Sequence, residues 1–318
     1  MKKFTLIFVT AVQVLQGGFP PHLLVLNQAV DKCEPRDFAQ MFTPDMLPKE
    51  NESFKDNELI TFLPHILERK DKDFKNSVLD ETLARAFTTH DKPYLSGLPF
   101  LVVALIEAGA DRDRTFHRRV LKNNPAVLIW HSQNCAYAEE ILSRGANPHE
   151  SIQHDRNIPL ICEAKSVRLA SILEKHGALV HSRTEPWQET VLHQAMNTGY
   201  DPDLLDYYTE HGLTVNVTNL CKETPFHALI GKVAEYMLDE DYQLHFAQKA
   251  EKLLKHGADL GIKSDGKTVS ELLEETIACF KEKSDYTGYD LSSLKRKQEA
   301  ELCLFGCESV RTLVNGRI

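Results

Sequence analysis

Apolar segments long enough for a helix alternate along this chain with short turns that contain glycine. Five of these segments end in a similar phrase, of which Leu253–Asp259 (LLKHGAD) is the clearest. The glycines of the five phrases, at positions 109, 145, 177, 212 and 257, lie 32 to 45 residues apart. A period in this range indicates stacked structural units rather than a single globular core. The five phrases are Ala108–Asp111, Arg144–Asn147, His176–Ala178, His211–Thr214 and His256–Asp259.

A second phrase falls between the glycines and predicts where helices begin. Its clearest copies are Thr190–Ala195 (TVLHQA) and Thr224–Ala228 (TPFHA). The hydroxyl of Thr224 can cap a helix, and Pro225 suits the first helical position, where an amide donor has no partner. Weaker copies are Asn124–Ala126, Ile158–Leu160, Thr268–Leu272 and Glu81–Ala86.

The glycine phrase predicts where helices end. Gly257 stands where a left-handed residue closes a helix, and Lys255 and His256 lie near the negative end of the helix dipole. Each repeat is therefore expected to be a helix, a turn, a second helix and a short extended connection. Because one such unit is too small to bury its own apolar face, neighbouring units must stack.

The segment Gly212–Val217 (GLTVNV), followed by Thr224–Ala228, resembles the ankyrin repeat, and Leu253–Asp259 does so too. The resemblance covers about residues 80 to 310 and weakens toward the N-terminus. It implies an all-α fold, an ankyrin-repeat solenoid of about five or six helix-turn-helix units with short hairpin connections and an N-terminal non-repeat cap.

The domain organisation follows from this resemblance. We expect a non-repeat cap segment over 1–77, ankyrin repeats over 78–283, and a C-terminal capping helix and tail over 284–318. The repeat between Thr224 and Thr268 is overlong, which places an insertion near 231–245. We expect this insertion to form a lengthened first helix plus a loop.

The resemblance also implies a partner-binding surface, at the hairpin tips and at exposed positions ahead of the first helices. Trp187 stands out there because tryptophan on a loop beside polar neighbours is a residue type that dominates interface energetics. The alternative is that Trp187 fills a gap between degenerate repeats. The candidate partner-binding residues are His154, Asp155, Asn157, Trp187, Glu189, Leu220, Cys221 and Glu223.

Two histidines and one asparagine receive structural roles from the same resemblance. His193 and His227 match the histidine that ties helix starts together by hydrogen bonds in ankyrin repeats. Asn216 stands where ankyrin asparagines can be hydroxylated, but its flanking residues differ from the preferred pattern. We therefore expect Asn216 to order the hairpin turn.

The composition narrows the partners. The 318-residue chain carries a formal net charge of −9, which argues against a surface that binds nucleic acid. Its seven cysteines are an odd number without framework spacing, which predicts free thiols in a reducing compartment. Cys303 and Cys307 share a helix face, and small buried residues are the preferred interpretation over a metal pair. We expect no metal, no cofactor and a monomer.

The first residues leave two interpretations open. Met1–Lys3 and the apolar run Phe4–Val14 have the form of a secretory signal, but Gln13 and Gln16 interrupt the run and no small-x-small cleavage site follows. The other interpretation is an element that covers the open end of the first repeat. No stretch reaches the ~18 apolar residues of a membrane span.

The sequence thus predicts a cytoplasmic protein-protein interaction module, acting as an adaptor or effector without catalysis. Its degenerate repeats, N-terminal cap and long insertion resemble the ankyrin effectors that bacteria deliver into host cells by type IV secretion. The alternative is an enzyme with a catalytic N-terminal segment whose repeats recruit substrate. In that case Cys33 would be the nucleophile, with His22 or His65 as its base.

Overall fold

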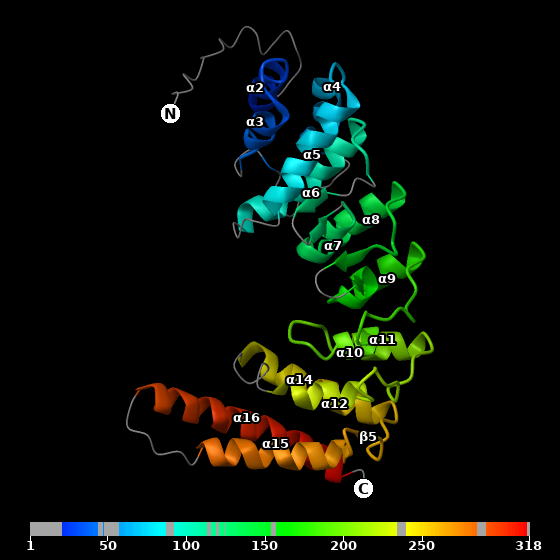
Figure 1. The fold of residues 1–318 in the computed structure, drawn as a ribbon, viewed down its shortest axis with the longest axis vertical. Helices are drawn as coiled ribbons and strands as arrows, with labels where there is room; N and C mark the ends of the chain where they lie inside the picture. Colours follow the sequence, from blue (N-terminus) through cyan, green and yellow to red (C-terminus); the bar gives the residue numbers. More distant parts are fainter. Residues whose placement is uncertain are drawn as a thin grey trace. The chain divides into compact units, whose positions relative to one another are not determined.

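The structure is a computed structural model, shown in Figure 1, and it is mostly helical with a few short strands. The chain divides into two compact units, Met1–Asn147 and Pro148–Ile318, which are described separately. The predicted boundary at residue 77 stays a prediction. The residues described are 21–43, 47, 57–86, 92–112, 116–118, 121–123, 125–153, 157–233, 240–284 and 291–316. The candidate signal segment, residues 1–20, lies outside them.

The first unit is built mainly from helices. Helix α6 packs against α4 and α5, and α3 packs against α5. Leu63, Leu83 and Leu101 are fully buried in its core. Its elements are α2 (Pro21–Ala29), α3 (Pro35–Gln40), α4 (Glu58–Leu67), α5 (Lys72–Ala86), α6 (Lys92–Glu107), the antiparallel hairpin of β1 (Phe116–Arg118) and β2 (Leu121–Asn123), α7 (Val127–Ser132) and α8 (Cys135–Ser143).

The helix start predicted from Glu81–Ala86 is wrong. These residues are the last turn and a half of α5, which begins at Lys72. The side chain of Asp71 accepts a hydrogen bond from the amide of Phe74 at 2.7 Å, so the cap lies ten residues earlier. Thr82 is buried inside the helix and its hydroxyl donates to the carbonyl of Val78, which is a helix-interior contact.

The described residues of the second unit form four successive helix pairs, coloured from green to red in Figure 1. The first members of the pairs, η3, α10, α12 and α15, pack on one another in chain order, and α14 packs between α11 and α16. The elements are β3 (Ser151–Gln153), β4 (Asn157–Pro159), the 3₁₀ helix η3 (Leu160–Glu163), α9 (Val167–Lys175), α10 (Val191–Gln194), α11 (Leu204–Glu210), α12 (Pro225–Gly231), α14 (Glu240–Lys255), β5 (Lys263–Ser264), β6 (Lys267–Thr268), α15 (Val269–Ser284) and α16 (Leu291–Asn315).

The predicted helix ends are confirmed. All five glycines of the recurring phrase have positive φ, between +79° and +99°, so each takes the left-handed conformation that follows a helix. Thr224 is the N-cap of α12, with its side chain accepting from the amide of His227, and Pro225 is the first helical residue. The glycines are Gly109, Gly145, Gly177, Gly212 and Gly257.

In the overlong repeat, both described helices are longer than their counterparts in the preceding pairs. Its first helix, α12, has seven residues and ends at Gly231, whereas its second helix, α14, has sixteen. The second helices of the preceding pairs, α9 and α11, have nine and seven. The expected lengthening of the first helix is present, because η3 and α10 have four residues each, but more of the described extra length lies in the second helix. Residues 234–239 of the insertion lie outside the described residues.

Histidine side chains link successive pairs, as predicted. The Nδ1 atom of His193 accepts from the amide of Thr190 at 3.2 Å, so Nε2 carries the proton and donates to the carbonyl of Glu223 at 2.9 Å. His227 repeats this arrangement, reaching the carbonyl of Lys267 at 3.3 Å. Each imidazole therefore joins the start of one helix to the hairpin of the next repeat.

The residue at the corresponding position of α15 is Glu271. Its carboxylate accepts from the amide of Thr268 at 2.7 Å, and its own amide donates to the hydroxyl of Thr268 at 3.2 Å. This reciprocal capping box satisfies the first turn of α15 locally.

Asn216 has the structural role predicted for it. Its Nδ2 donates to the carbonyl of Gly257 at 3.1 Å, and its Oδ1 accepts from the amide of Asp259 at 2.7 Å. These bonds tie the turn after α11 to the turn after α14, so Asn216 orders two successive turns rather than one.

Candidate functional site

The candidate site is formed by three turns of the second unit that precede α10, α12 and α15. We call residues 183–190, 217–224 and 263–268 the hairpin row. Within each turn, backbone hydrogen bonds or strand pairing close the two arms onto each other. Neighbouring turns are joined as well, because the amide of Leu220 donates to the carbonyl of Trp187 at 2.9 Å and Ser264 Oγ donates to the carbonyl of Cys221 at 3.2 Å. The row is therefore continuous.

Arg183 strengthens the junction between the first two turns. Its guanidinium donates to the carbonyl of Gln188 at 2.9 Å in its own turn and to the carbonyl of Thr218 at 3.1 Å in the next. A charged donor shared by two loops restrains both of them at once. The turns are thus held in register by main-chain acceptors and not by packing alone.

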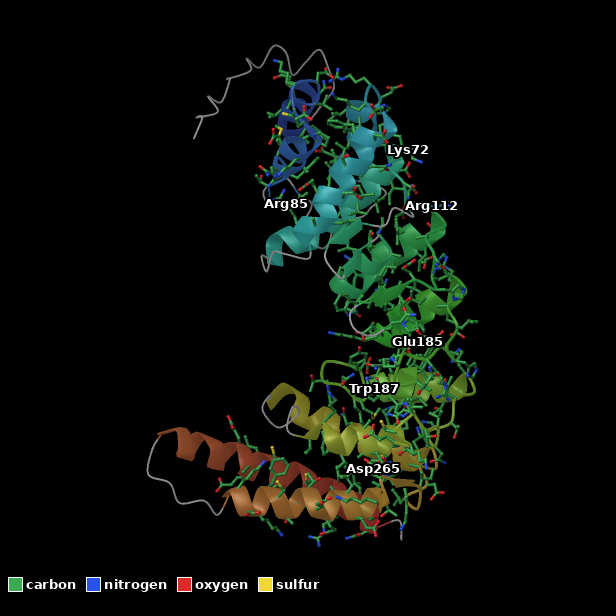
Figure 2. The ribbon with its side chains drawn as sticks, in the orientation of Figure 1. Lys72, Arg85, Arg112, Glu185, Trp187 and Asp265 are labelled. Atoms are coloured by element: carbon green, nitrogen blue, oxygen red, sulfur yellow. The ribbon has the colours of Figure 1, made fainter. Side chains whose placement is uncertain are left out.

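Two large apolar side chains of the row face solvent. Trp187 is 40% exposed and Leu220 is 64% exposed, and the hydrogen bond between their main chains makes them neighbours. Figure 2 labels Glu185 and Trp187 on the first turn and Asp265 on the third. These apolar side chains are in contact with water in the free protein. Contact with a partner would remove that water, and the burial of apolar surface would favour binding.

The tips of the three turns contain residues in the left-handed conformation. Gln188 has φ +56°, Lys222 has φ +62° and Asp265 has φ +48°. Residues with a Cβ rarely adopt this conformation, and they persist in it only where the surrounding structure holds them. Glycine would serve the turn geometry better, so at Gln188 and Lys222 the turn carries a side chain at a cost in stability.

The predicted partner-binding residues are only partly brought together. The main chain of Asn157 pairs with that of Glu185, at 3.2 and 3.0 Å, which places Asn157 next to the first turn. Leu220 and Cys221 are exposed at the second turn, beside Trp187. His154 and Asp155 lie outside the described residues.

Glu189 and Glu223 differ from the other predicted residues because their carboxylates are engaged within the protein. The carboxylate of Glu189 accepts from Gln194 Nε2 at 2.7 Å, and that of Glu223 accepts from Asn219 Nδ2 at 2.9 Å. Both residues are half-buried. These contacts stabilise the turns, so Glu189 and Glu223 contribute to the candidate surface by holding its loops in place.

Sequence reasoning missed three exposed features of the second unit. Leu179, in the turn after α9, is 63% exposed, and Phe305, on α16, is 70% exposed with Leu302 one turn earlier. A helix-face count over α16 could have found Leu302 and Phe305, because the buried positions 303, 307, 310 and 314 define the opposite face. The left-handed side chains of the turns leave no comparable sequence signal.

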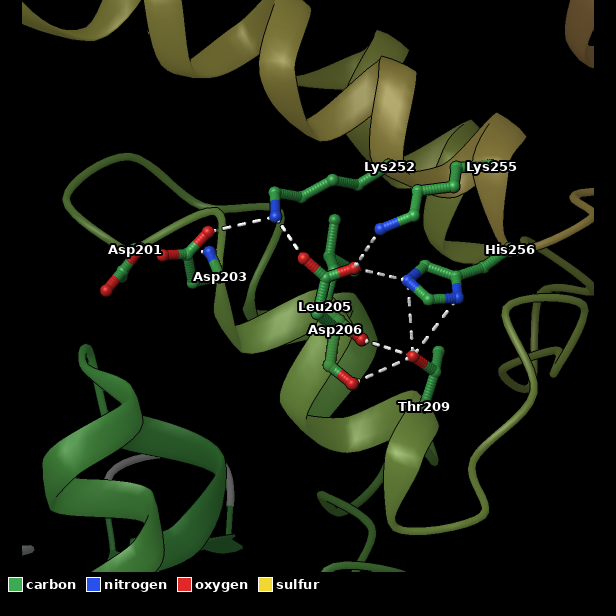
Figure 3. A network of polar contacts seen from close by, with 8 residues as sticks. All are labelled: Asp201, Asp203, Leu205, Asp206, Thr209, Lys252, Lys255 and His256. Atoms are coloured by element: carbon green, nitrogen blue, oxygen red, sulfur yellow. Dashed lines mark hydrogen bonds and ion pairs between the residues drawn. The ribbon is translucent and has the colours of Figure 1, made fainter.

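A polar network joins α11 to α14 away from the row, as Figure 3 shows. The carboxylate of Asp206 accepts from Lys252 and from His256 Nε2, the latter at 2.6 Å, and Lys255 adds a contact at 3.4 Å. Burial alone would raise the pKa of Asp206, but the hydrogen bonds from Lys252 and His256 hold it well below its usual range. The network positions the two second helices of adjacent pairs.

Cys33, the candidate nucleophile, does not lie in the environment of an activated thiol. Burial raises the pKa of Cys33, and Asp37 raises it further, which is opposite to the lowering that a nucleophilic thiolate requires. His65 is exposed on α4, and the side chain of His22 is outside those described. Cys303 and Cys307 are buried in α16, as predicted, and burial raises the pKa of Cys307 to about 12.

The described residues contain neither a cluster of metal-ligating side chains nor a membrane-spanning helix. They contain no group of three or more histidine, cysteine, aspartate or glutamate residues arranged to hold a metal ion. Among the helices described, none combines the length and the apolar character needed to span a membrane.

No family model matches the chain, and no curated protein matches it.

Proposed function

We propose that this chain is an ankyrin-repeat protein that binds a partner protein through the hairpin row and performs no catalysis of its own. The repeated glycine and Thr-x-x-His phrases, the four helix pairs of the second unit and the histidine links between them support this proposal. Stacked helix pairs present a continuous row of turns, and such rows serve as binding surfaces in repeat proteins.

The observation that carries the proposal is the pair Trp187 and Leu220. Both are exposed, both belong to turns that hydrogen bonds hold in place, and their main chains are bonded to each other. A rigid aromatic anchor beside an aliphatic neighbour binds at low entropic cost because the loops are already ordered. The exposed charges around them, Arg183, Glu185 and Lys222, have both signs and would form a polar rim.

The experiment is affinity capture with the full chain, comparing it with Trp187→Ala and Leu220→Ala variants, followed by mass spectrometry. We expect at least one captured protein to be lost from both variants and retained by Leu179→Ala. That control removes an apolar side chain of equal exposure from a turn outside the row. Isothermal titration with the purified partner should then show a loss of at least 2 kcal/mol for Trp187→Ala, the size of an interface hot spot. Equal capture by all variants would overturn the proposal.

The cellular setting is a separate part of the proposal. We infer that the chain acts in a cytoplasm, and that it belongs to the effectors which bacteria deliver into host cells. Its seven cysteines without a bridge and its degenerate repeats support this setting. A translocation reporter fused to the chain tests it: signal in the recipient cell, lost when the secretion apparatus is removed, is expected. A reporter that stays in the donor cell contradicts delivery and leaves partner binding untouched.

A further inference from the structure

The Trp187 hairpin, residues 183–190, is supported from behind by a buried amide. Gln194, the last residue of α10, is 6% exposed, and its Nε2 donates to the carboxylate of Glu189 at 2.7 Å. Glu189 in turn holds both arms of the hairpin, because its carbonyl accepts from the amide of Thr184 at 2.8 Å and its amide donates to Thr184 Oγ1 at 3.2 Å. The position of Gln194 therefore fixes the base of the hairpin.

The hydrogen bonds continue from Gln194 into the interior. Gln194 Oε1 accepts from Asn197 Nδ2 at 3.0 Å, and the carbonyl of Asn197 accepts from Lys249 Nζ at 2.8 Å. Lys249 belongs to α14 and its side chain is fully buried. We call Lys249, Asn197, Gln194 and Glu189 the polar relay. It connects the second helix of one repeat to the hairpin that begins the preceding repeat.

Among the described residues, the carboxylate of the next hairpin has a different partner. Glu223 corresponds to Glu189, but Asn219 of the same turn binds its carboxylate at 2.9 Å. The residue that corresponds to Gln194 is Ala228, which has no side-chain donor. The carboxylate of the second hairpin is therefore bound by a residue of its own turn, whereas the carboxylate of the hairpin with the exposed tryptophan is bound by a residue of α10.

A buried lysine is costly unless the ammonium is paired. Desolvation lowers the pKa of Lys249 to about 7, and the nearby carboxylate of Asp201 offsets only part of that effect. A methionine would fill a similar volume at this position without the cost. The hydrogen bond from Nζ to the carbonyl of Asn197 offsets part of this cost.

We propose that Gln194 and Lys249 are positioning residues that set how the hairpin presents Trp187. The inference rests on the proposed function only in taking Trp187 as the anchor, and the contacts of the relay can be tested without a partner.

The test uses the full chain with Trp130→Phe, because the chain has two tryptophans and this change leaves Trp187 as the single fluorophore. In this background we compare Gln194→Met, Asn197→Ala and Lys249→Met by acrylamide quenching and by amide hydrogen exchange over residues 184–189. Each variant removes one link, so exchange should accelerate about fivefold, the effect of losing one hydrogen bond of ordinary strength. Quenching of Trp187 should rise in parallel.

The matched control is Lys252→Met, which removes the same charge from the same helix. Lys252 binds Asp203 at 2.9 Å and also Asp206, and it has no contact in the relay. It should leave the exchange of residues 184–189 unchanged. The double variant Gln194→Met/Lys249→Met should exceed neither single variant, since both break one series. Glu189→Gln keeps an acceptor for Gln194 and should behave as the parent, whereas Glu189→Leu should not.

Three outcomes separate the possibilities. Faster exchange confined to residues 184–189 supports the relay even if no partner is ever captured, in which case only the proposed function fails. Unchanged exchange and quenching in Gln194→Met and Asn197→Ala overturn the relay even if Trp187 proves essential for partner binding. Equal acceleration in Lys252→Met would mean that general loosening of α14 causes the effect, and this too overturns it. Because Gln194→Met and Asn197→Ala leave α14 intact, the test stands if Lys249→Met does not fold.

Discussion

His193 and His227 bind as neutral imidazoles, each with one nitrogen accepting and the other donating. Burial lowers the pKa of both, and the carbonyls of Glu223 and Lys267 offset this only in part. A lowered pKa in the folded state means that the unfolded chain takes up protons first as the pH falls. Their contribution to stability is therefore complete above about pH 6.5, the ordinary pKa of histidine, and is lost as the solution becomes more acidic.

We therefore expect the free energy of unfolding to fall below about pH 6.5, and to fall less steeply in a His193→Gln/His227→Gln double variant. Urea denaturation followed by circular dichroism at a series of pH values measures both slopes. The control is His176→Gln/His211→Gln, which changes two histidines at helix ends. Its free energy of unfolding should fall more steeply with decreasing pH than that of the first double variant. Parallel profiles for the parent and the first double variant would contradict the assignment.

Lys249 predicts a change in the free energy of unfolding above pH 7. Its pKa is about 7 in the folded state and 10.5 when unperturbed, so between these values the unfolded chain binds the extra proton. Stability should then rise with pH from about 7, by up to about 1.4 kcal/mol per unit from this group. Lys249→Met should remove this rise. Chemical denaturation between pH 7 and 9.5 measures it, and a rise that survives in the variant would argue against a buried ammonium.

At the scale of the secondary-structure element, the sequence determines most helix starts and ends but not the length of every helix. Helix starts and ends followed from Thr224, Pro225 and the five glycines, because caps and left-handed closures depend on local chemistry. The start assigned at Glu81 failed because a threonine inside a helix leaves the same local pattern as one at a cap. The length of α14 could not be foreseen, since tertiary contacts decide which helix absorbs an insertion.

The candidate site shows the same division. The sequence pointed to Trp187 and Leu220 by type and place, and the structure exposes both. It could not reveal that Lys249 is connected through Asn197 to Gln194, and Gln194 to the hairpin, because Lys249 and Asn197 lie more than fifty positions apart and meet only in the folded chain. Buried side chains that hold a surface loop in place, such as Gln194 and Lys249, have no sequence pattern by which they could be recognised.

The left-handed tip of the second hairpin gives a prediction at this scale. Lys222→Gly removes a Cβ from a conformation that disfavours it and should raise the free energy of unfolding by about 0.5 kcal/mol, after the entropic cost of glycine. Gly212→Ala is the reverse change at a helix end and should lower it by about 1 kcal/mol. Thermal melts of both variants test the pair. A destabilised Lys222→Gly would show that the lysine side chain holds the turn.

For the whole molecule, the arrangement of helix pairs in the second unit predicts which helices lose stability when a mutation destabilises one of them. Leu205→Ala in α11 empties a fully buried site and should cost about 2 to 5 kcal/mol. Because α11 belongs with α10 and packs against α14, hydrogen exchange should accelerate first in these helices and less in α15. Exchange mapped by mass spectrometry measures the order, and uniform acceleration through residues 148–318 would show that the unit unfolds as one block.

Glu271 has a consequence for the links between successive hairpins. His193 and His227 each donate a hydrogen bond to a carbonyl of the following hairpin, so each needs that hairpin to satisfy its ring nitrogen. Glu271 occupies the same position in α15 but turns its carboxylate back on Thr268, and an ionised carboxylate has no proton to offer. Within the described residues, the series of side-chain links from one helix start to the next hairpin therefore ends at α15, where the first turn of the helix is capped from within.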